Sequence, residues 1–168
     1  MCLKTATVLL AEDDPNDAFL VQRAFRKAEL SHRLVHAADG QQAVDYLSGV
    51  PPFDDRLAHP FPNLLLLDLK MPRLNGFEVL EWLQGRAEFR SLPAIVLSSS
   101  DHQSDIEQAR VLGAAEYYRK PGDPAELLGI IRALDERWLR TNHSLFRVEP
   151  LAQLSLPLVQ GEPSVERA

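Results

Sequence analysis

The chain has 168 residues, of which 45% are apolar and 25% are charged, an ordinary composition for one globular domain with a hydrophobic core. Its formal net charge of -6 disfavours attraction to nucleic-acid phosphates, so we expect no direct nucleic-acid binding and instead a protein partner or a cation. No apolar run reaches about eighteen residues and the first residues lack a signal peptide's apolar stretch, so we expect no membrane contact and a cytoplasmic location.

Cysteine and histidine offer little chemistry in this sequence. The single cysteine, Cys2, cannot form an internal disulfide, and the five histidines show no pair at the spacing of zinc ligands. We therefore interpret the histidines as surface or packing residues and expect no structural zinc site.

The first predicted strand, residues 7–11, is a short apolar and β-branched run that ends in an acidic turn, residues 12–15. Asp14 before Pro15 favours a helix start, because the aspartate side chain can accept a backbone N–H and proline fits the first helical position. Four apolar residues then recur at helical spacing: Ala18, Val21, Phe25 and Ala28. The chain therefore begins with a strand and a helix joined by carboxylates.

A second unit of the same kind follows. Residues 33–36 form a weaker predicted strand, and Asp39 with Gly40 opens a helix whose apolar stripe includes Ala43, Val44 and Leu47. Residues 48–62 hold four prolines among polar and charged residues, which predicts an irregular surface connection longer than usual for this kind of unit.

The central strand is predicted from four consecutive leucines at 64–67, a run without helical period that suits a strand covered on both faces. It delivers Asp68 to the point where the strand reaches the surface. Residues 72–76 predict a turn, after which apolar residues mark the inner face of a third helix: Phe77, Val79, Leu80 and Leu83.

Two further strands and helices complete the pattern. A strand at 93–98 ends in three serines, and Ser100 or Asp101 is predicted to cap a helix that Gly113 terminates. A shorter strand at 116–119 is closed by Lys120-Pro121, and a last helix is predicted from about residue 123 to 138.

Five strand-helix units in a row predict an α/β fold with a doubly wound, five-stranded parallel sheet in the flavodoxin-like order 2-1-3-4-5. In that order the carboxyl ends of the strands meet at one edge of the sheet, where open α/β folds place their ligands. The polar residues expected at this edge are Glu12, Asp13, Asp68, Ser98 and Lys120.

This set of side chains predicts phosphoryl chemistry. Three converging carboxylates repel one another unless a cation lies between them, and oxygen ligands without cysteine or histidine favour a hard ion such as Mg²⁺. Lys120 and the Ser98 hydroxyl are suited to contact phosphoryl oxygens. We therefore interpret Asp68 as a nucleophile that forms an aspartyl phosphate.

These motifs resemble the receiver domain of response regulators. The resemblance covers roughly residues 7–139 and rests on four separated elements in the right order. They are Glu12-Asp13 after the first strand, Asp68 within Asp-Leu-Lys-Met-Pro-Arg-Leu-Asn-Gly, Ser98 after the fourth strand, and Lys120-Pro121 after the fifth.

The resemblance implies a role for each motif residue. Asp68 would accept a phosphoryl group from a histidine kinase, with Mg²⁺ held by Asp13, Asp68 and the Lys70 carbonyl and with Glu12 assisting through water. Ser98 and Lys120 would contact the phosphoryl group. Tyr117 would be the switch aromatic, and the Lys120-Pro121 peptide would be cis, a conformation that only X-Pro bonds adopt at low cost.

Some positions depart from the commoner family pattern: Glu12 stands for Asp, Ser98 for Thr, and Gly122 for an aromatic residue. None of these changes removes a functional group. The acidic opening and the proline-bearing loop most resemble the small regulators paired with bacterial and cyanobacterial phytochromes, so a bacteriophytochrome is a candidate partner kinase.

Two alternative functions fit the sequence less well. An aspartyl-phosphate phosphatase on a related scaffold would need a general acid-base Asp two residues after the nucleophile, and that position is Lys70. A degenerate receiver that binds partners without phosphorylation is disfavoured by the intact carboxylates. We therefore expect no enzyme activity apart from the chain's own phosphorylation and dephosphorylation.

The predicted domain organisation is a receiver at 1–139 and a C-terminal extension at 140–168. The extension is too short for a helix-turn-helix effector, so the receiver surface itself is expected to carry the signal. We expect it to do so by changing its association, as a homodimer that forms through the fourth helix, fifth strand and fifth helix. The extension is more hydrophobic than a free tail usually is, so we expect part of it to dock on its own domain or on a second copy. Its apolar residues include Leu145, Phe146, Leu151, Leu154, Leu156 and Leu158.

Overall fold

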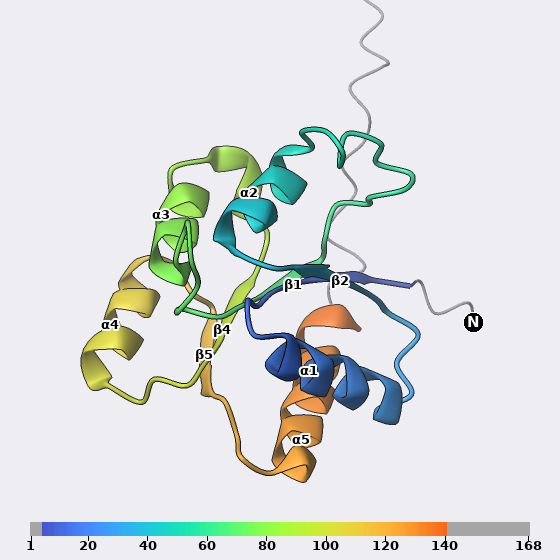
Figure 1. Ribbon diagram of the computed structural model, residues 1–168, viewed down its shortest axis with the longest axis vertical. Coiled ribbons are helices and arrows are strands. Elements are labelled where there is room, and N and C mark those ends of the chain that lie inside the picture. The colour runs from blue at the N-terminus through green and yellow to red at the C-terminus, as the bar shows by residue number, and fades with distance from the viewer. Residues whose placement is uncertain (1–4, 141–168) are drawn as a thin grey trace, which may run out of the picture.

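The computed structural model describes residues 5–140, a parallel sheet flanked by helices on both faces (Figure 1). The strands are β1 (Thr7–Ala11), β2 (Arg33–Ala37), β3 (Leu64–Leu67), β4 (Ala94–Ser98) and β5 (Glu116–Arg119). The helices are α1 (Pro15–Lys27), α2 (Gly40–Ser48), α3 (Gly76–Gln84), α4 (Gln103–Val111) and α5 (Pro124–Leu134). A 3₁₀ helix at Ala87–Phe89 and a π-helical turn at Asp135–Leu139 are the short elements.

The sheet confirms the predicted fold class and strand order. All neighbouring strands are parallel, and the order is β2-β1-β3-β4-β5. Helices α1 and α5 pack together on one face, whereas α2 and α3 pack together and α3 contacts α4 on the other. Within residues 5–140, no helix has the length and apolar character needed to cross a membrane.

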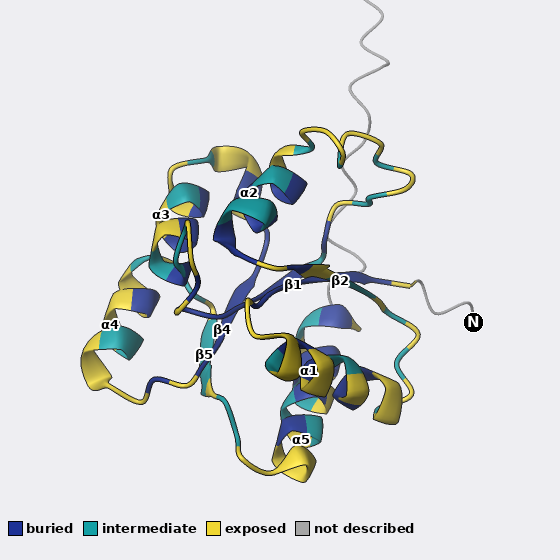
Figure 2. Ribbon diagram, in the orientation of Figure 1, coloured by how far each residue is buried: buried dark blue, intermediate teal, exposed yellow. Residues whose placement is uncertain are grey.

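The leucine run of β3 is buried on both sides, which explains why it shows no polar alternation. Leu65 and Leu67 belong to the core beneath α2 and α3, whereas Leu64 and Leu66 belong to the core beneath α1 and α5. All four leucines have no exposed surface. Figure 2 shows the inner strands of the sheet buried, the edge strands β2 and β5 only partly buried, and exposed residues on the outer faces of the helices. β3 is therefore a rigid platform for the residue that follows it.

Side-chain caps begin the four helices α1, α2, α3 and α5, and the sequence predicts the starts of α1 at Asp14 and of α2 at Asp39. Asp14 Oδ1 accepts the Asn16 N–H at 2.7 Å, and Asp39 Oδ1 accepts the Gln42 N–H at 2.8 Å. Asn75 forms a capping box with Glu78 at the start of α3. These bonds satisfy backbone N–H groups that would otherwise lack partners within the helix.

The predicted cap of α4 is wrong. Its N-cap is His102, which makes no side-chain cap bond. Ser100 is instead buried, and its hydroxyl donates to Asp105 within the first turn of the helix. Gly113, however, follows the C-cap with φ +94, as expected of the residue that ends this helix.

The 48–62 connection is irregular, as predicted, but it is tied down by side chains. The Arg56 guanidinium donates to the carbonyls of Tyr46 and Leu47, each at 2.8 Å. The Tyr46 hydroxyl donates to the Pro60 carbonyl at 2.8 Å, although its ring is only 1% exposed. The loop therefore packs onto the end of α2.

We expect Leu65→Ala to lower the free energy of unfolding by about 2–5 kcal/mol, because it leaves a cavity at a fully buried site. The same substitution at Leu57, which is 94% exposed, should change stability by less than about 0.5 kcal/mol. Urea denaturation followed by circular dichroism measures both, and equal losses would contradict the assignment of β3 to the core.

Candidate functional site

Backbone hydrogen bonds bring the ends of four strands to one edge of the sheet. The Asp68 N–H donates to the Ala11 carbonyl at 3.0 Å, which continues the pairing of β3 with β1. The Lys120 N–H donates to the Ser98 carbonyl at 2.7 Å, which continues the pairing of β5 with β4. Residues more than a hundred positions apart thereby become neighbours.

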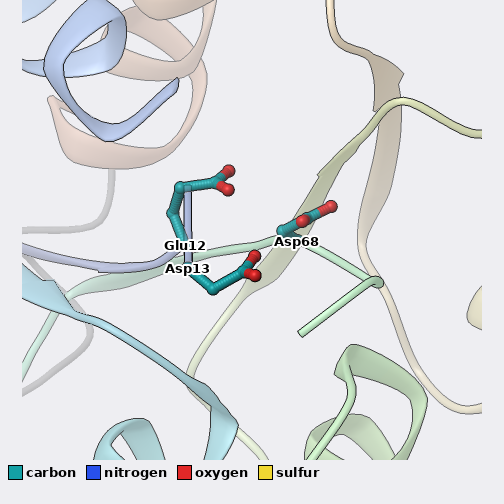
Figure 3. Close-up of side chains that lie close together, drawn as sticks. All are labelled: Glu12, Asp13 and Asp68. Carbon is teal, nitrogen blue, oxygen red and sulfur yellow. The ribbon is translucent and has the colours of Figure 1, made fainter. Parts of the chain in front are cut away.

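Glu12, Asp13 and Asp68 offer carboxylate oxygens that all lie within 4.8 Å of one another. Figure 3 shows the three side chains converging, with the Asp13 carboxylate directed toward Asp68. Glu12 is 2% exposed and Asp68 is 5% exposed, whereas Asp13 is open to solvent. The structure thus brings together the carboxylates that the sequence placed at this edge.

Lys120 lies among these carboxylates and one more. Its Nζ is 2.7 Å from Glu12 Oε2 and 3.4 Å from Asp68 Oδ2. It also donates at 2.8 Å to Asp17 Oδ2, a contact that sequence reasoning missed. The only signal for Asp17 was its place in the first turn of the helix that follows the acidic turn.

Burial and charge oppose one another in this cluster. Desolvation raises the pKa of Glu12 to about 7, although Lys120 lowers it in part. Desolvation also raises the pKa of Asp68, against the Lys120 charge and the backbone N–H groups of Leu69 and Lys70. Burial lowers the pKa of Lys120, but its contacts with Asp17 and Glu12 and the charge of Asp68 outweigh burial and raise it. The lysine is therefore charged and the buried carboxyls hold protons unusually well.

Ser98 and Tyr117 lie at the β4 and β5 side of the site. Ser98 has no exposed surface, and its Oγ accepts the Ser100 N–H at 3.3 Å. The Tyr117 hydroxyl donates to the Ser100 carbonyl at 2.9 Å, and burial raises the Tyr117 pKa. Ser100, which the sequence suggested only as a helix cap, therefore connects the two residues.

The turn after Asp68 is held close to the strand end. The Gly76 N–H donates to the Leu69 carbonyl at 3.0 Å, and a Cβ on Gly76 would lie 2.3 Å from the Asp68 carbonyl oxygen. Arg73, with φ 66, pairs with the buried Asp39 carboxylate at the start of α2. A glycine at 76 is thus required by close packing, and the turn is fastened to the neighbouring unit.

The predicted cis peptide at Lys120-Pro121 is wrong for this structure. Within residues 5–140 the cis peptide bond is Pro51-Pro52, so Lys120-Pro121 is trans. The trans form is the lower-energy state of X-Pro bonds by about 0.5–1 kcal/mol. With this bond trans, Lys120 still reaches Glu12, Asp17 and Asp68.

The donor set suits a hard divalent cation. All three converging groups are carboxylates, and the described residues around them supply no cysteine or histidine ligand. Two of the three are buried, so a cation would offset both their repulsion and their desolvation.

Comparison with protein families identifies the same family that the sequence motifs resemble. The model of the response regulator receiver domain matches residues 8–132. The chain belongs to the response regulator receiver family. Receiver domains act in two-component signalling, and the matched residues run from β1 into α5.

Solved structures of other receivers resemble this one closely. Response regulator RPA3017, in red light signalling of R. palustris, is 38% identical with a TM-score of 0.77, over 81% of this chain and 95% of that one. The phosphorylated cyanobacterial phytochrome response regulator RcpA is 30% identical with a TM-score of 0.75, over 82% and 96%. The Mn²⁺-bound form of Rcp1 from Synechocystis is 29% identical with a TM-score of 0.72, over 81% and 96%.

The raised pKa of Glu12 predicts that the stability of the metal-free receiver depends on pH. Its pKa rises from 4.5 to about 7 on folding, so the folded state retains a proton that the unfolded state loses between these values. The contribution of Glu12 to stability is therefore full below pH 4.5 and falls as pH rises to 7. Glu12→Gln should match the wild type near pH 4.5 and be more stable by about 1–3 kcal/mol near pH 8.

Denaturation in chelator at several pH values measures this difference. The exposed Glu81→Gln is the matched control and should follow the wild type throughout. A Glu12→Gln curve that runs parallel to the wild type would contradict the proton uptake.

Proposed function

We propose that this chain is a single-domain response regulator that accepts a phosphoryl group from a sensor histidine kinase on Asp68, with Mg²⁺ as cofactor. The observation that carries the proposal is the placement of Asp68 at the end of β3, beside Glu12 and Asp13 and 3.4 Å from the Lys120 ammonium. Asp68 follows the central strand of the sheet, and the rest of the set reaches it from strands on both sides.

Asp68 is the nucleophile in this proposal. One of its carboxylate oxygens attacks phosphorus as the bond to the kinase histidine nitrogen breaks, and the bonding electron pair stays on the imidazole. Hydrolysis reverses the modification, because water attacks phosphorus and Asp68 leaves as a carboxylate. The chain thus catalyses only its own phosphorylation and dephosphorylation.

Asp13, Asp68 and the Lys70 carbonyl are the proposed ligands of Mg²⁺, and Glu12 assists through water. When bound, the ion neutralises negative charge on the phosphoryl oxygens. The converging carboxylates support this assignment, as does the Mn²⁺ in the structure of the similar Rcp1.

Ser98 and Lys120 are the proposed contacts of the phosphoryl group, and Ser98 with Tyr117 forms the switch. Lys120 must shift from Glu12 and Asp17 to hold that group. Ser98 and Tyr117 both form a hydrogen bond with Ser100, so a shift of Ser98 would alter the positions of β5 and the start of α4. Switching is therefore proposed to alter association through α4, β5 and α5, in a homodimer or with another partner.

The partner kinase is proposed to be a phytochrome. Two regulators of similar structure support this, because one acts in red light signalling and the other is a cyanobacterial phytochrome response regulator. We also propose that the receiver spans residues 1–139 and is followed by a C-terminal extension at 140–168. The docking predicted for the extension falls outside the described residues.

We expect a small phosphodonor such as acetyl phosphate, with Mg²⁺, to add one acid-labile phosphoryl group to the wild type, and none to Asp68→Asn. Intact-protein mass spectrometry measures the added mass. Asp54→Asn, at an exposed carboxylate of the 48–62 loop, is the charge-matched control and should be modified like the wild type.

Modification that persists in Asp68→Asn would refute the assignment of the nucleophile. The same phosphorylated sample, run in sedimentation velocity beside the unmodified protein, also tests the dimer. An unchanged sedimentation coefficient would contradict phosphorylation-driven dimerisation but not the phosphoacceptor role of Asp68.

A further inference from the structure

Lys120 has two kinds of carboxylate partner. Glu12 and Asp68 belong to the three converging carboxylates, and they lie 2.7 Å and 3.4 Å from the ammonium. Asp17 lies outside that group, on α1, and it binds the same ammonium at 2.8 Å. The side chain of Asp17 is 37% exposed, whereas Glu12 is 2% exposed. The ammonium therefore bridges a buried acidic site and a hydrated carboxylate beside it.

We infer that Asp17 is a positioning residue for Lys120: it holds the ammonium when a divalent cation occupies the three carboxylates and no phosphoryl group is yet present. The inference rests on the proposed function for the cation itself. It adds a residue that neither the motifs nor the resemblance assigned.

The physical reason is competition between two positive charges. A divalent cation held by Glu12, Asp13 and Asp68 would repel the Lys120 ammonium from the Glu12 and Asp68 oxygens that the ammonium contacts in this structure. If the Lys120 side chain moved out into water, it would lose its ion pairs with the carboxylates and its packing at the end of β5. Asp17 offers a partner that Lys120 already contacts, so the lysine can leave Glu12 without leaving the site.

The position of Asp17 supports this role. It lies in the first turn of α1, where the helix dipole favours a negatively charged side chain. Its partner follows β5, 103 residues further along the chain. Lys120 is then already charged and close to Asp68 when a phosphoryl group arrives.

We expect Asp17→Asn to weaken Mg²⁺ binding about two- to fivefold, as loss of a half-exposed ion pair predicts. Isothermal titration calorimetry of the full chain with MgCl₂ measures the dissociation constant without any phosphorylation. Asp17→Glu keeps the charge on a longer arm and should restore binding to near the wild-type value.

Two controls separate positioning from simple loss of charge. Asp14→Asn removes the same charge from the same turn while still capping α1, and it should change Mg²⁺ binding less than Asp17→Asn. In a Lys120→Ala background, which lacks the ammonium, Asp17→Asn should have no larger effect than Asp14→Asn. Matching circular dichroism spectra and unfolding midpoints confirm that the variants are folded.

Equal effects of Asp17→Asn and Asp14→Asn would overturn the inference, and so would an Asp17→Asn effect that persists undiminished without Lys120. If the wild type binds Mg²⁺ and Asp17→Asn binds it equally well, only the positioning role of Asp17 is refuted. If the wild type binds no Mg²⁺, the proposed Mg²⁺ cofactor is refuted as well.

Discussion

The ion pairing of Lys120 with Glu12, Asp17 and Asp68 is the interaction on which the site depends. Burial strips hydration from Glu12 and Asp68, and this desolvation raises the pKa of both carboxyls, with the charge of Asp68 adding to the effect at Glu12. The Lys120 ammonium offsets part of this desolvation cost at both residues. It is a movable charge on a flexible arm, so it can give up its position to a cation or follow a phosphoryl group. In the proposed function, the lysine that stabilises the acidic site is also the one that contacts the phosphoryl group.

The sheet makes this arrangement possible by fixing where the strands end. β3 is buried on both faces by its leucines, so the position of Asp68 is set by packing rather than by a loop. The next residues are held by Gly76 against the Asp68 carbonyl and by the Arg73 pair with Asp39. A rigid position favours in-line attack on phosphorus, because the nucleophile is already held in the geometry that the reaction needs. In the proposed mechanism, the parts of the site that move are Lys120 and the proposed switch residues, Ser98 and Tyr117.

Local patterns predicted most of this molecule. The leucine run, the Asp14-Pro15 start and Gly113 are each decided by neighbours in sequence, and all three predictions are confirmed. Convergence of the strand ends also followed, because parallel order fixes which edge they share. What was missed depends on distant partners. The predicted cap of α4 is wrong because the Ser100 hydroxyl donates to Asp105 and the Ser100 carbonyl accepts the Tyr117 hydroxyl. The contact between Asp17 and Lys120 was missed because only folding brings these distant residues together.

A crystal structure with Mg²⁺ and beryllium fluoride, which mimics a phosphoryl group on a carboxylate, would show directly whether Asp68 is the phosphoacceptor. We expect beryllium bonded to Asp68 and Mg²⁺ at about 2.1 Å from oxygens of Asp13 and Asp68. We also expect the Lys120 ammonium in contact with fluoride. Beryllium fluoride on a different carboxylate, or a cation bound away from Asp68, would contradict this assignment.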